Sequence, residues 1–219
     1  MFRVTAIIEC AKLLFHSILV QLHQNGGMTE TAYVRYLSFQ HHLTNGVQRH
    51  FLTIVSHPSL AGKRHFRDFL YRFALEEEPH YDIARHDLEV LGRTVLPCPI
   101  DVKLWWAYFD SVVPTRPFLR LGATCVLENL GAGAGAIGHQ LLDEAPFLNE
   151  KNTRFLRIHF HEDLPHGEQI LAAIKEANPS DLEIRDLEEG ATIGATLYLR
   201  MANWAIGNCD FPGDSHDFS

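Results

Sequence analysis

Residues 159–168, HFHEDLPHGE, place three histidines and three carboxylates within ten positions. An α-helix turns about 100° per residue, so residues four and seven positions apart lie on one stripe of its surface. His159, Asp163 and His166 have this spacing, whereas the other polar residues of the stretch point elsewhere. The spacing therefore predicts a helix of the form H-x-x-x-D-x-x-H, with three potential metal ligands on one face.

The rest of the chain predicts an all-α protein. Alternating strand patterns and internal repeats are absent from the sequence. Residues 92–101 contain two prolines and should form a loop. Helical bundles build metal sites from side chains that project inward from facing helices. We expect seven helices, at about residues 4–24, 29–57, 60–91, 101–113, 118–145, 152–177 and 180–208.

Length and composition favour a single domain. The 219 residues have 46% hydrophobic content, enough for a substantial core. We expect one bundle over residues 1–208 and a loose tail over 209–219. The apolar N-terminal stretch is interrupted by Glu9, Lys12 and His16, and no small-residue cleavage site follows it. It is typical of an amphipathic core helix rather than a signal peptide or a membrane span.

Charge and cysteine usage exclude several classes of partner and site. The net charge of −8 and the pI near 5.9 argue against nucleic acid or an anionic membrane as a main partner. The four cysteines are scattered and form no C-x-x-C pair, which argues against a zinc knuckle or a redox dithiol. We expect free thiols in a reducing cytoplasm.

Two other predicted helices offer partners for the histidine-rich stretch. Glu77 and His80 form an E-x-x-H pair, a spacing that helical bundles use for di-iron and di-manganese sites. Glu76 and Glu78 flank Glu77 and leave the acid ligand ambiguous, although the spacing favours Glu77. Glu128 is the only acid between residues 110 and 143, and a carboxylate in so apolar a helix is costly to bury unless it is paired or metal-bound. The candidate metal ligands are Glu77, His80, Glu128, His159, Asp163 and His166.

The donor types indicate which metals the site would accept. Three carboxylates and three imidazoles form a mixed oxygen and nitrogen set without sulfur. Such a set suits iron or manganese better than a structural zinc site, which prefers cysteine-rich tetrahedra. Ligand type does not separate iron from manganese, so both metals remain candidates.

Three stretches, at residues 76–92, 122–138 and 155–168, resemble the haem-oxygenase-like di-iron oxidases and oxygenases. They read EEEPHYDIARHDLEVLG, GATCVLENLGAGAGAIG and FLRIHFHEDLPHGE, and they follow the order found in that family. The resemblance covers roughly residues 30 to 200. It implies a seven-helix haem-oxygenase-like bundle, on which homodimers are known, so that a homodimer is expected only by analogy.

The resemblance also implies the cofactor and the reaction class. Glu77, His80 and His159 would bind one iron, Asp163 and His166 the other, and Glu128 would bridge the two or be shared. The two ferrous ions would react with O₂ and oxidise a small molecule such as an amino acid or a medium-chain fatty acid. N-oxygenation, C–C cleavage and oxidative decarboxylation all remain open as outcomes.

Two features depart from the family pattern. Some relatives contribute a further acid from the second helix, where this chain has Gln40, His41 and His42. Either the second iron is less well held, or a histidine substitutes. Pro165 lies inside the sixth predicted helix and should kink it between Asp163 and His166.

Other functions on the same fold give competing interpretations. A thiaminase-like enzyme would use a nucleophilic cysteine, for which Cys125 is the candidate. A haem-binding enzyme would need a proximal histidine near the N-terminus, where His16 lies. A non-catalytic helical binding protein would need no ligand set. For the glycine run at residues 131–138, close helix packing is favoured over a role in a substrate pocket.

Overall fold

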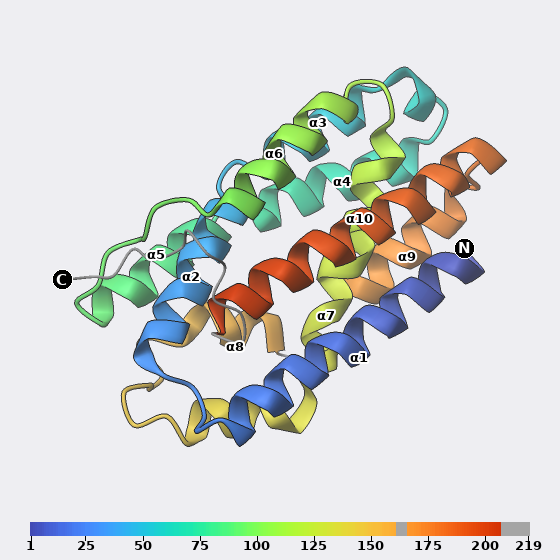
Figure 1. Ribbon diagram of the computed structural model, residues 1–219. Coiled ribbons are helices and arrows are strands. Elements are labelled where there is room, and N and C mark those ends of the chain that lie inside the picture. Colours follow the sequence, from blue (N-terminus) through green and yellow to red (C-terminus); the bar gives the residue numbers. More distant parts are fainter. Residues whose placement is uncertain (161–165, 207–219) are drawn as a thin grey trace.

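The computed structural model describes residues 1–160 and 166–206, and within these ranges it contains helices and no strands. The predicted all-α class is confirmed (Figure 1). The elements are α1 (Phe2–Gln24), α2 (Glu30–Thr44), α3 (Gln48–Ser56), the 3₁₀ turn η1 (Pro58–Leu60), α4 (Arg64–Glu77), α5 (His80–Val90), α6 (Ile100–Val112), α7 (Pro117–Asp143), α8 (Arg154–Phe160), α9 (His166–Glu176) and α10 (Asp181–Ala205).

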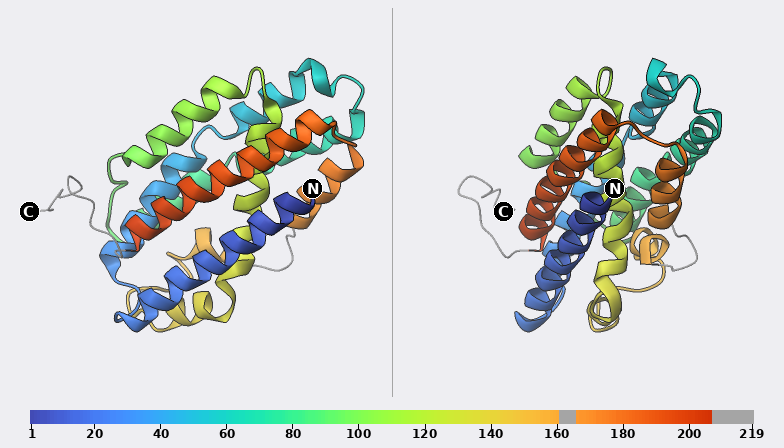
Figure 2. Two further views of the ribbon diagram at one scale, coloured as in Figure 1. Left: turned by 45° about the vertical axis from the view of Figure 1, so that its right-hand side comes forward. Right: turned by 90° about the vertical axis from the view of Figure 1, so that its right-hand side faces the viewer.

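The three longest helices, α1, α7 and α10, pack against one another. α1 and α10 lie side by side, and α7 crosses both of them (Figures 1 and 2). α2 packs on α5, α3 packs on α4, and α8 and α9 each contact α7. The middle of α7 is therefore reached by several helices that are distant in sequence, which is where an inward-facing site can be built.

Glycines bring α7 and α10 into backbone contact. A Cβ on Gly190 of α10 would lie 1.8 Å from the carbonyl oxygen of Leu119, and one on Gly122 of α7 would lie 2.1 Å from that of Leu187. Within the predicted glycine run, Gly131 approaches the His159 carbonyl and would place a Cβ 2.6 Å from its oxygen. Gly131 therefore fits the favoured interpretation of close packing, and it also lines the cavity described below, whereas a Cβ on Gly135 would meet nothing within 4 Å.

The prediction of two continuous helices at residues 29–57 and 60–91 is wrong, because each range is interrupted. Residues 45–47 separate α2 from α3, and Gly46 has a φ of 90°, a left-handed conformation that interrupts a helix. Pro79 separates α4 from α5, because proline has no N–H to donate and its ring clashes with the carbonyl four residues earlier. These two breaks turn two of the expected helices into four, α2 to α5.

The helix expected at residues 152–177 is described only at its two ends. α8 ends at Phe160 and α9 begins at His166. Asp163 and the kink expected at Pro165 lie outside the described residues, as does the predicted tail at 209–219. Inside α7, Gly135 has a non-helical φ of 51° and interrupts the regular helix.

In the described residues, α1 is the one helix that is long and apolar enough, by length and composition alone, to cross a membrane. It buries one apolar face against α7 and α10, which agrees with the expected core helix. The buried residues of that face are Val4, Ile8, Ala11, Phe15, Leu19 and Leu22.

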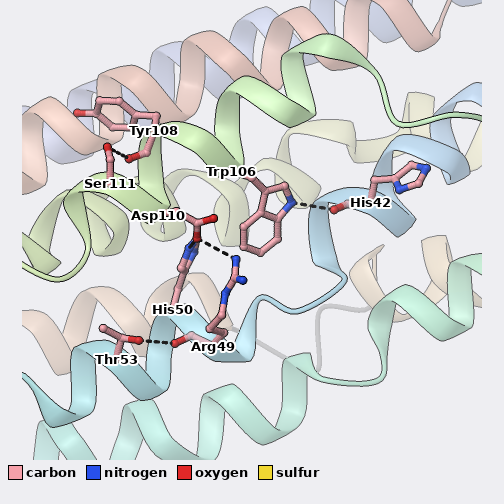
Figure 3. Close-up of polar contacts among 8 residues, drawn as sticks. All are labelled: His42, Arg49, His50, Thr53, Trp106, Tyr108, Asp110 and Ser111. Atoms are coloured by element: carbon pink, nitrogen blue, oxygen red, sulfur yellow. Dashed lines mark hydrogen bonds and ion pairs between the residues drawn. The ribbon is translucent and has the colours of Figure 1, made fainter.

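A polar cluster ties α6 to α2 and α3 (Figure 3). Asp110 Oδ1 lies 2.8 Å from both Arg49 Nη2 and His50 Nε2. The indole Nε1 of Trp106 donates to the carbonyl oxygen of His42 at 2.9 Å. Burial lowers the pKa of His50 to about 4, so its ring is neutral at pH 7 and donates a hydrogen bond from Nε2 to Asp110 without forming an ion pair. The cluster joins the helices beside α7 and commits Asp110 to them.

Candidate metal centre

The structure brings five of the six predicted ligands to one place in the bundle. Glu77 ends α4 and His80 begins α5, Glu128 lies in the middle of α7, His159 lies near the end of α8, and His166 begins α9. The sixth, Asp163, lies outside the described residues. That these side chains bind metal stays a prediction; their convergence is a property of the fold.

Among the three consecutive glutamates, Glu77 is the one that points inward. It is 6% exposed, whereas Glu76 and Glu78 are exposed to solvent. Its Oε2 lies 2.8 Å from Nδ1 of His80 across the break at Pro79. The break thus places together two side chains that we had expected on one continuous helical face.

Glu77, Glu128 and His166 offer ligand atoms that all lie within 4.8 Å of one another. His166 Nδ1 is 3.6 Å from Glu77 Oε1 and 3.6 Å from Glu128 Oε2. Metal–ligand bonds of roughly 2.1 Å place the ligands of one ion about 3 to 4.2 Å apart, depending on the angle between them. The observed spacings therefore suit donors that share a cation.

His159 has one ring nitrogen held and the other available. Its Nδ1 donates to the carbonyl oxygen of Phe155 at 2.6 Å, which fixes the tautomer that keeps a lone pair on Nε2. Its ring centroid lies 5.0 Å from that of His80. His159 keeps an exposed edge, yet the protein packed around its ring, together with His80, lowers its pKa to about 4. The ring is therefore neutral at pH 7, as a metal ligand must be.

Burial and mutual repulsion act against two free carboxylates at this site. Burial raises the pKa of Glu128, and the charge on Glu77 raises it further. Burial alone would raise the pKa of Glu77, but His80, His159 and His166 outweigh it and lower that pKa. Glu77 Oε1 is buried without a hydrogen-bond partner. A divalent cation would satisfy this oxygen and offset both charges, so the donor set fits a metal.

Asp87 positions the helix that carries His159. It is fully buried, and its Oδ2 accepts a hydrogen bond from the backbone N–H of Phe155 at 2.8 Å. This N–H lies in the first turn of α8, whose donors have no partner within the helix. Asp87 therefore binds the backbone of α8 and fixes the start of the helix that carries His159.

Replacing Asp87 should loosen α8. We expect Asp87→Ala to lower the free energy of unfolding by about 1–2 kcal/mol, the usual cost of losing a helix cap, and to weaken metal binding through His159. Asp87→Asn keeps an acceptor oxygen and should cost less. Urea unfolding at pH 7 and a metal titration measure both effects. Equal stability of the alanine variant and the parent would contradict this role for Asp87.

A cavity of about 120 Å³ adjoins the five predicted ligands. Its polar lining away from them includes Tyr36, Gln40, Tyr198 and Arg120, and Gln40 Nε2 donates to the hydroxyl of Tyr198 at 2.8 Å. Sequence reasoning named Gln40 and missed the other three, although Arg120 is a lone charge in an apolar stretch, the same signal that singled out Glu128. The apolar lining includes Phe15, Val47, Phe51, Leu127, Leu130 and Ile158.

The histidines that follow Gln40 do not substitute for the acid found in some relatives. His41 Nδ1 contacts the carbonyl oxygen of Tyr81 at 2.9 Å, and His42 Nε2 contacts that of Leu96 at 2.8 Å. Neither lines the cavity, whereas Gln40 does. The interpretation in which a histidine replaces the acid is therefore wrong for the described residues.

The competing site residues are also poorly placed. Cys125 is fully buried, and burial raises its pKa to about 12, so it is a protonated thiol rather than a nucleophilic thiolate at pH 7. His16 is exposed, its Nδ1 lies 3.2 Å from the carbonyl oxygen of Gly133, and it does not line the cavity. These positions favour neither the thiaminase-like nor the haem-binding interpretation.

Comparison with solved structures identifies the fold. A crystal structure of a domain of unknown function with a heme oxygenase-like fold, from Shewanella denitrificans OS217, superposes with a TM-score of 0.75 over 92% of this chain and 88% of that one. The protein has the haem-oxygenase-like fold. The two sequences are 18% identical, so the likeness between them concerns architecture. The fold expected from the sequence is confirmed, and no family model matches the chain.

Two curated proteins share a local sequence similarity with this haem-oxygenase-like chain. They are the mycobacterial β-ketoacyl-acyl-carrier-protein synthase III proteins of Mycobacterium avium and Mycolicibacterium paratuberculosis. Each is 31% identical over 99 residues, which is 45% of this chain and 29% of the synthase. The chain thus spans less than a third of the curated relatives that it matches, and their synthase activity is a property of those proteins.

Proposed function

We propose that the protein is an O₂-dependent non-haem di-iron oxidase or oxygenase that acts on a small molecule. The observation that carries this proposal is the convergence of Glu77, Glu128 and His166, with His80 and His159 adjoining them, beside a cavity. Five elements supply these side chains, and all five residues are of the types that bind iron or manganese.

The described donors supply two carboxylates and three imidazoles, and Asp163 is the sixth ligand that the proposal requires. Manganese shares the donor preferences of iron and is the competing metal. Two ferrous ions bound here would supply the electrons that reduce O₂, and hence the oxidant for the substrate.

The residues of this chain have separate tasks in that reaction. The carboxylates of Glu77 and Glu128 offset the charge of the ions. Contact with Glu128 raises the pKa of His166, so metal binding should displace a proton from that ring. The apolar lining of the cavity limits water around the substrate.

The three described cysteines are free thiols, which supports a reducing cytoplasm as the compartment we propose.

Anaerobic loading with Fe(II) tests the proposal. We expect nearly two irons per chain after removal of excess metal. We also expect that a screen of small amino acids and fatty acids identifies a compound that accelerates O₂ uptake by the loaded protein. A parallel loading with Mn(II) tests the competing metal. Retention of manganese in place of iron, without O₂ uptake, would identify a manganese site. A chain that retains neither metal, or that binds haem instead, overturns the proposal.

A further inference from the structure

Arg120 is a buried charge in the wall of the cavity that adjoins the five predicted ligands. It lies in α7, is 3% exposed, and lines the cavity together with Glu128. Its Nη1 donates to the hydroxyl of Thr124 at 2.5 Å. Its Nε is buried and has no hydrogen-bond partner within residues 1–160 and 166–206. The guanidinium therefore has unused donors inside a closed part of the protein.

Aromatic rings surround this guanidinium, and they do not neutralise it. Its central carbon lies 5.2 Å from the ring centroid of Phe51, 5.3 Å from that of Trp105 and 5.5 Å from that of Phe109. Cation–π contacts of this kind stabilise the charge but carry no countercharge. Burial lowers the pKa of Arg120 to about 10, so the side chain is still protonated at pH 7.

In the described residues no acid forms an ion pair with Arg120, although the charges on Glu128 and Glu77, which line the same cavity, oppose the effect of burial on its pKa. Three acids of α6 and α10 have other partners. Asp110 of α6 contacts Arg49 and His50 (Figure 3). Asp101 of α6 lies 3.2 Å from Arg200. Asp186 of α10 lies 2.7 Å from Arg116, the N-cap residue of α7. An unpaired buried charge is costly, and an anionic ligand in the cavity would offset that cost.

The geometry of the free donors suits a carboxylate. With Nη1 used by Thr124, the Nε and Nη2 edge of the guanidinium remains, and this edge can donate two parallel hydrogen bonds to one carboxylate. Lysine cannot form this fork. The three predicted carboxylate ligands, Asp163 included, carry three negative charges at most, fewer than the four positive charges of two ferrous ions, so a filled centre would also leave the cavity positive.

The size of the cavity limits the ligand. An apolar protein cavity of roughly 150 Å³ accepts benzene, and this one has about 120 Å³. The Cα atoms of Arg120 and Glu128 are about 12 Å apart along the axis of α7, and both side chains extend into the same cavity, where the charge on Glu128 acts on Arg120. This space matches a molecule of amino-acid size, and a long acyl chain would have to extend beyond it.

We propose that Arg120 binds the carboxylate of the substrate, and that the substrate is a small carboxylic acid of amino-acid size. Its carboxylate would lie on the Nε and Nη2 edge of Arg120, and its other end would face Glu77, Glu128 and His166. The role of that other end as the oxidised part rests on the proposed function, whereas the anion site does not.

Calorimetric titration with butyrate and butyramide tests the site, because the two probes match in size and differ in charge. We expect the anaerobic Fe(II)-loaded protein to bind butyrate at least about 10-fold more tightly than butyramide. Arg120→Met, which is similar in length and uncharged, should weaken butyrate binding on the order of 100-fold, while iron content stays at the parent level. Arg116→Met removes a charge from the N-cap of α7, outside the cavity, and should leave butyrate affinity unchanged.

Arg120→Lys covers the case in which the methionine variant does not fold. It keeps the positive charge but cannot donate two parallel hydrogen bonds, and it should weaken butyrate binding roughly 10-fold. Equal affinity for the two probes, or unchanged butyrate affinity in Arg120→Lys, overturns the proposal. Butyrate binding that persists in Arg120→Met but needs iron places the carboxylate on the metal and overturns it too.

Titration of the metal-free protein separates this site from the proposed function. Butyrate binding that depends on Arg120 in a chain that retains no iron would confirm the anion site while the di-iron proposal fails. Two irons per chain without any preference for butyrate would do the reverse.

Discussion

Glu128→Gln is expected to reduce iron content from near two per chain to one or none and to lower O₂ uptake at least about 100-fold. Glu128 reaches the predicted centre from the middle of α7, with its Oε2 3.6 Å from His166. An amide of the same shape carries no charge to offset the ions, and even residues that only orient ligands cost 10- to 100-fold in metal affinity when they are replaced. Anaerobic loading followed by metal analysis and an oxygen electrode measures both effects.

The same substitution should stabilise the metal-free protein. Burial and the charge on Glu77 raise the pKa of Glu128, which means that its ionised form is unfavourable in the folded state at pH 7. A neutral amide of equal size removes that penalty. We expect the melting temperature to rise by about 2–4 °C, which corresponds to about 1 kcal/mol in a chain of this length. Gain of stability with loss of function is the pattern of a functional site.

Asp143→Asn is the matched control for Glu128→Gln. Asp143 is the last residue of the same helix and is exposed. Its replacement removes one carboxylate from α7 and should leave iron content, O₂ uptake and melting temperature at parent values. A lower melting temperature in metal-free Glu128→Gln, with iron content unchanged, would show that Glu128 stabilises the fold and takes no part in a metal site.

The sequence predicts the fold class and five of the positions that converge, because both depend on local rules. Hydrophobic periodicity and helix-ending residues identify helices without tertiary information. Glu77 and His80 were paired by spacing on one helix, yet the structure pairs them across a break at Pro79. The pairing is the same, since residues three apart stay close through a single tight turn. Pro79, which makes the break, is itself a helix-ending signal in the sequence.

Other features of the site depend on contacts between helices that are distant in sequence, and local sequence patterns do not predict such contacts. A lone charge in an apolar helix can face a partner, a ligand or solvent. The role of Arg120 can therefore be inferred only from the aromatic rings and the cavity that surround it in the structure. His41 and His42 looked like candidate ligands, but their rings contact backbone carbonyls of other segments. Likewise, the contact between Gly131 and the carbonyl of His159 joins residues 28 positions apart.

Gly190→Ala is the substitution for which local and tertiary rules give opposite signs. Gly190 lies inside α10, where alanine is favoured over glycine by about 1 kcal/mol. However, the added Cβ would lie 1.8 Å from the carbonyl oxygen of Leu119 and 2.7 Å from its Cα. Both atoms belong to the backbone of α7, so no side-chain rotation can relieve the contact. We expect the clash to dominate and to lower the free energy of unfolding by about 3 kcal/mol or more.

This loss should reach the predicted metal centre, because the helix that must move is the one that carries Glu128 and Arg120. Separating α7 from α10 by even a few tenths of an ångström displaces these side chains relative to those on the other helices, and metal affinity depends on such placement. Urea unfolding, with metal analysis of the folded fraction, measures both effects. Gly62→Ala is the control, since a Cβ there meets nothing within 4 Å. If Gly190→Ala is as stable as the Gly62 variant, α7 and α10 do not touch through their backbones, and the cavity wall is built differently.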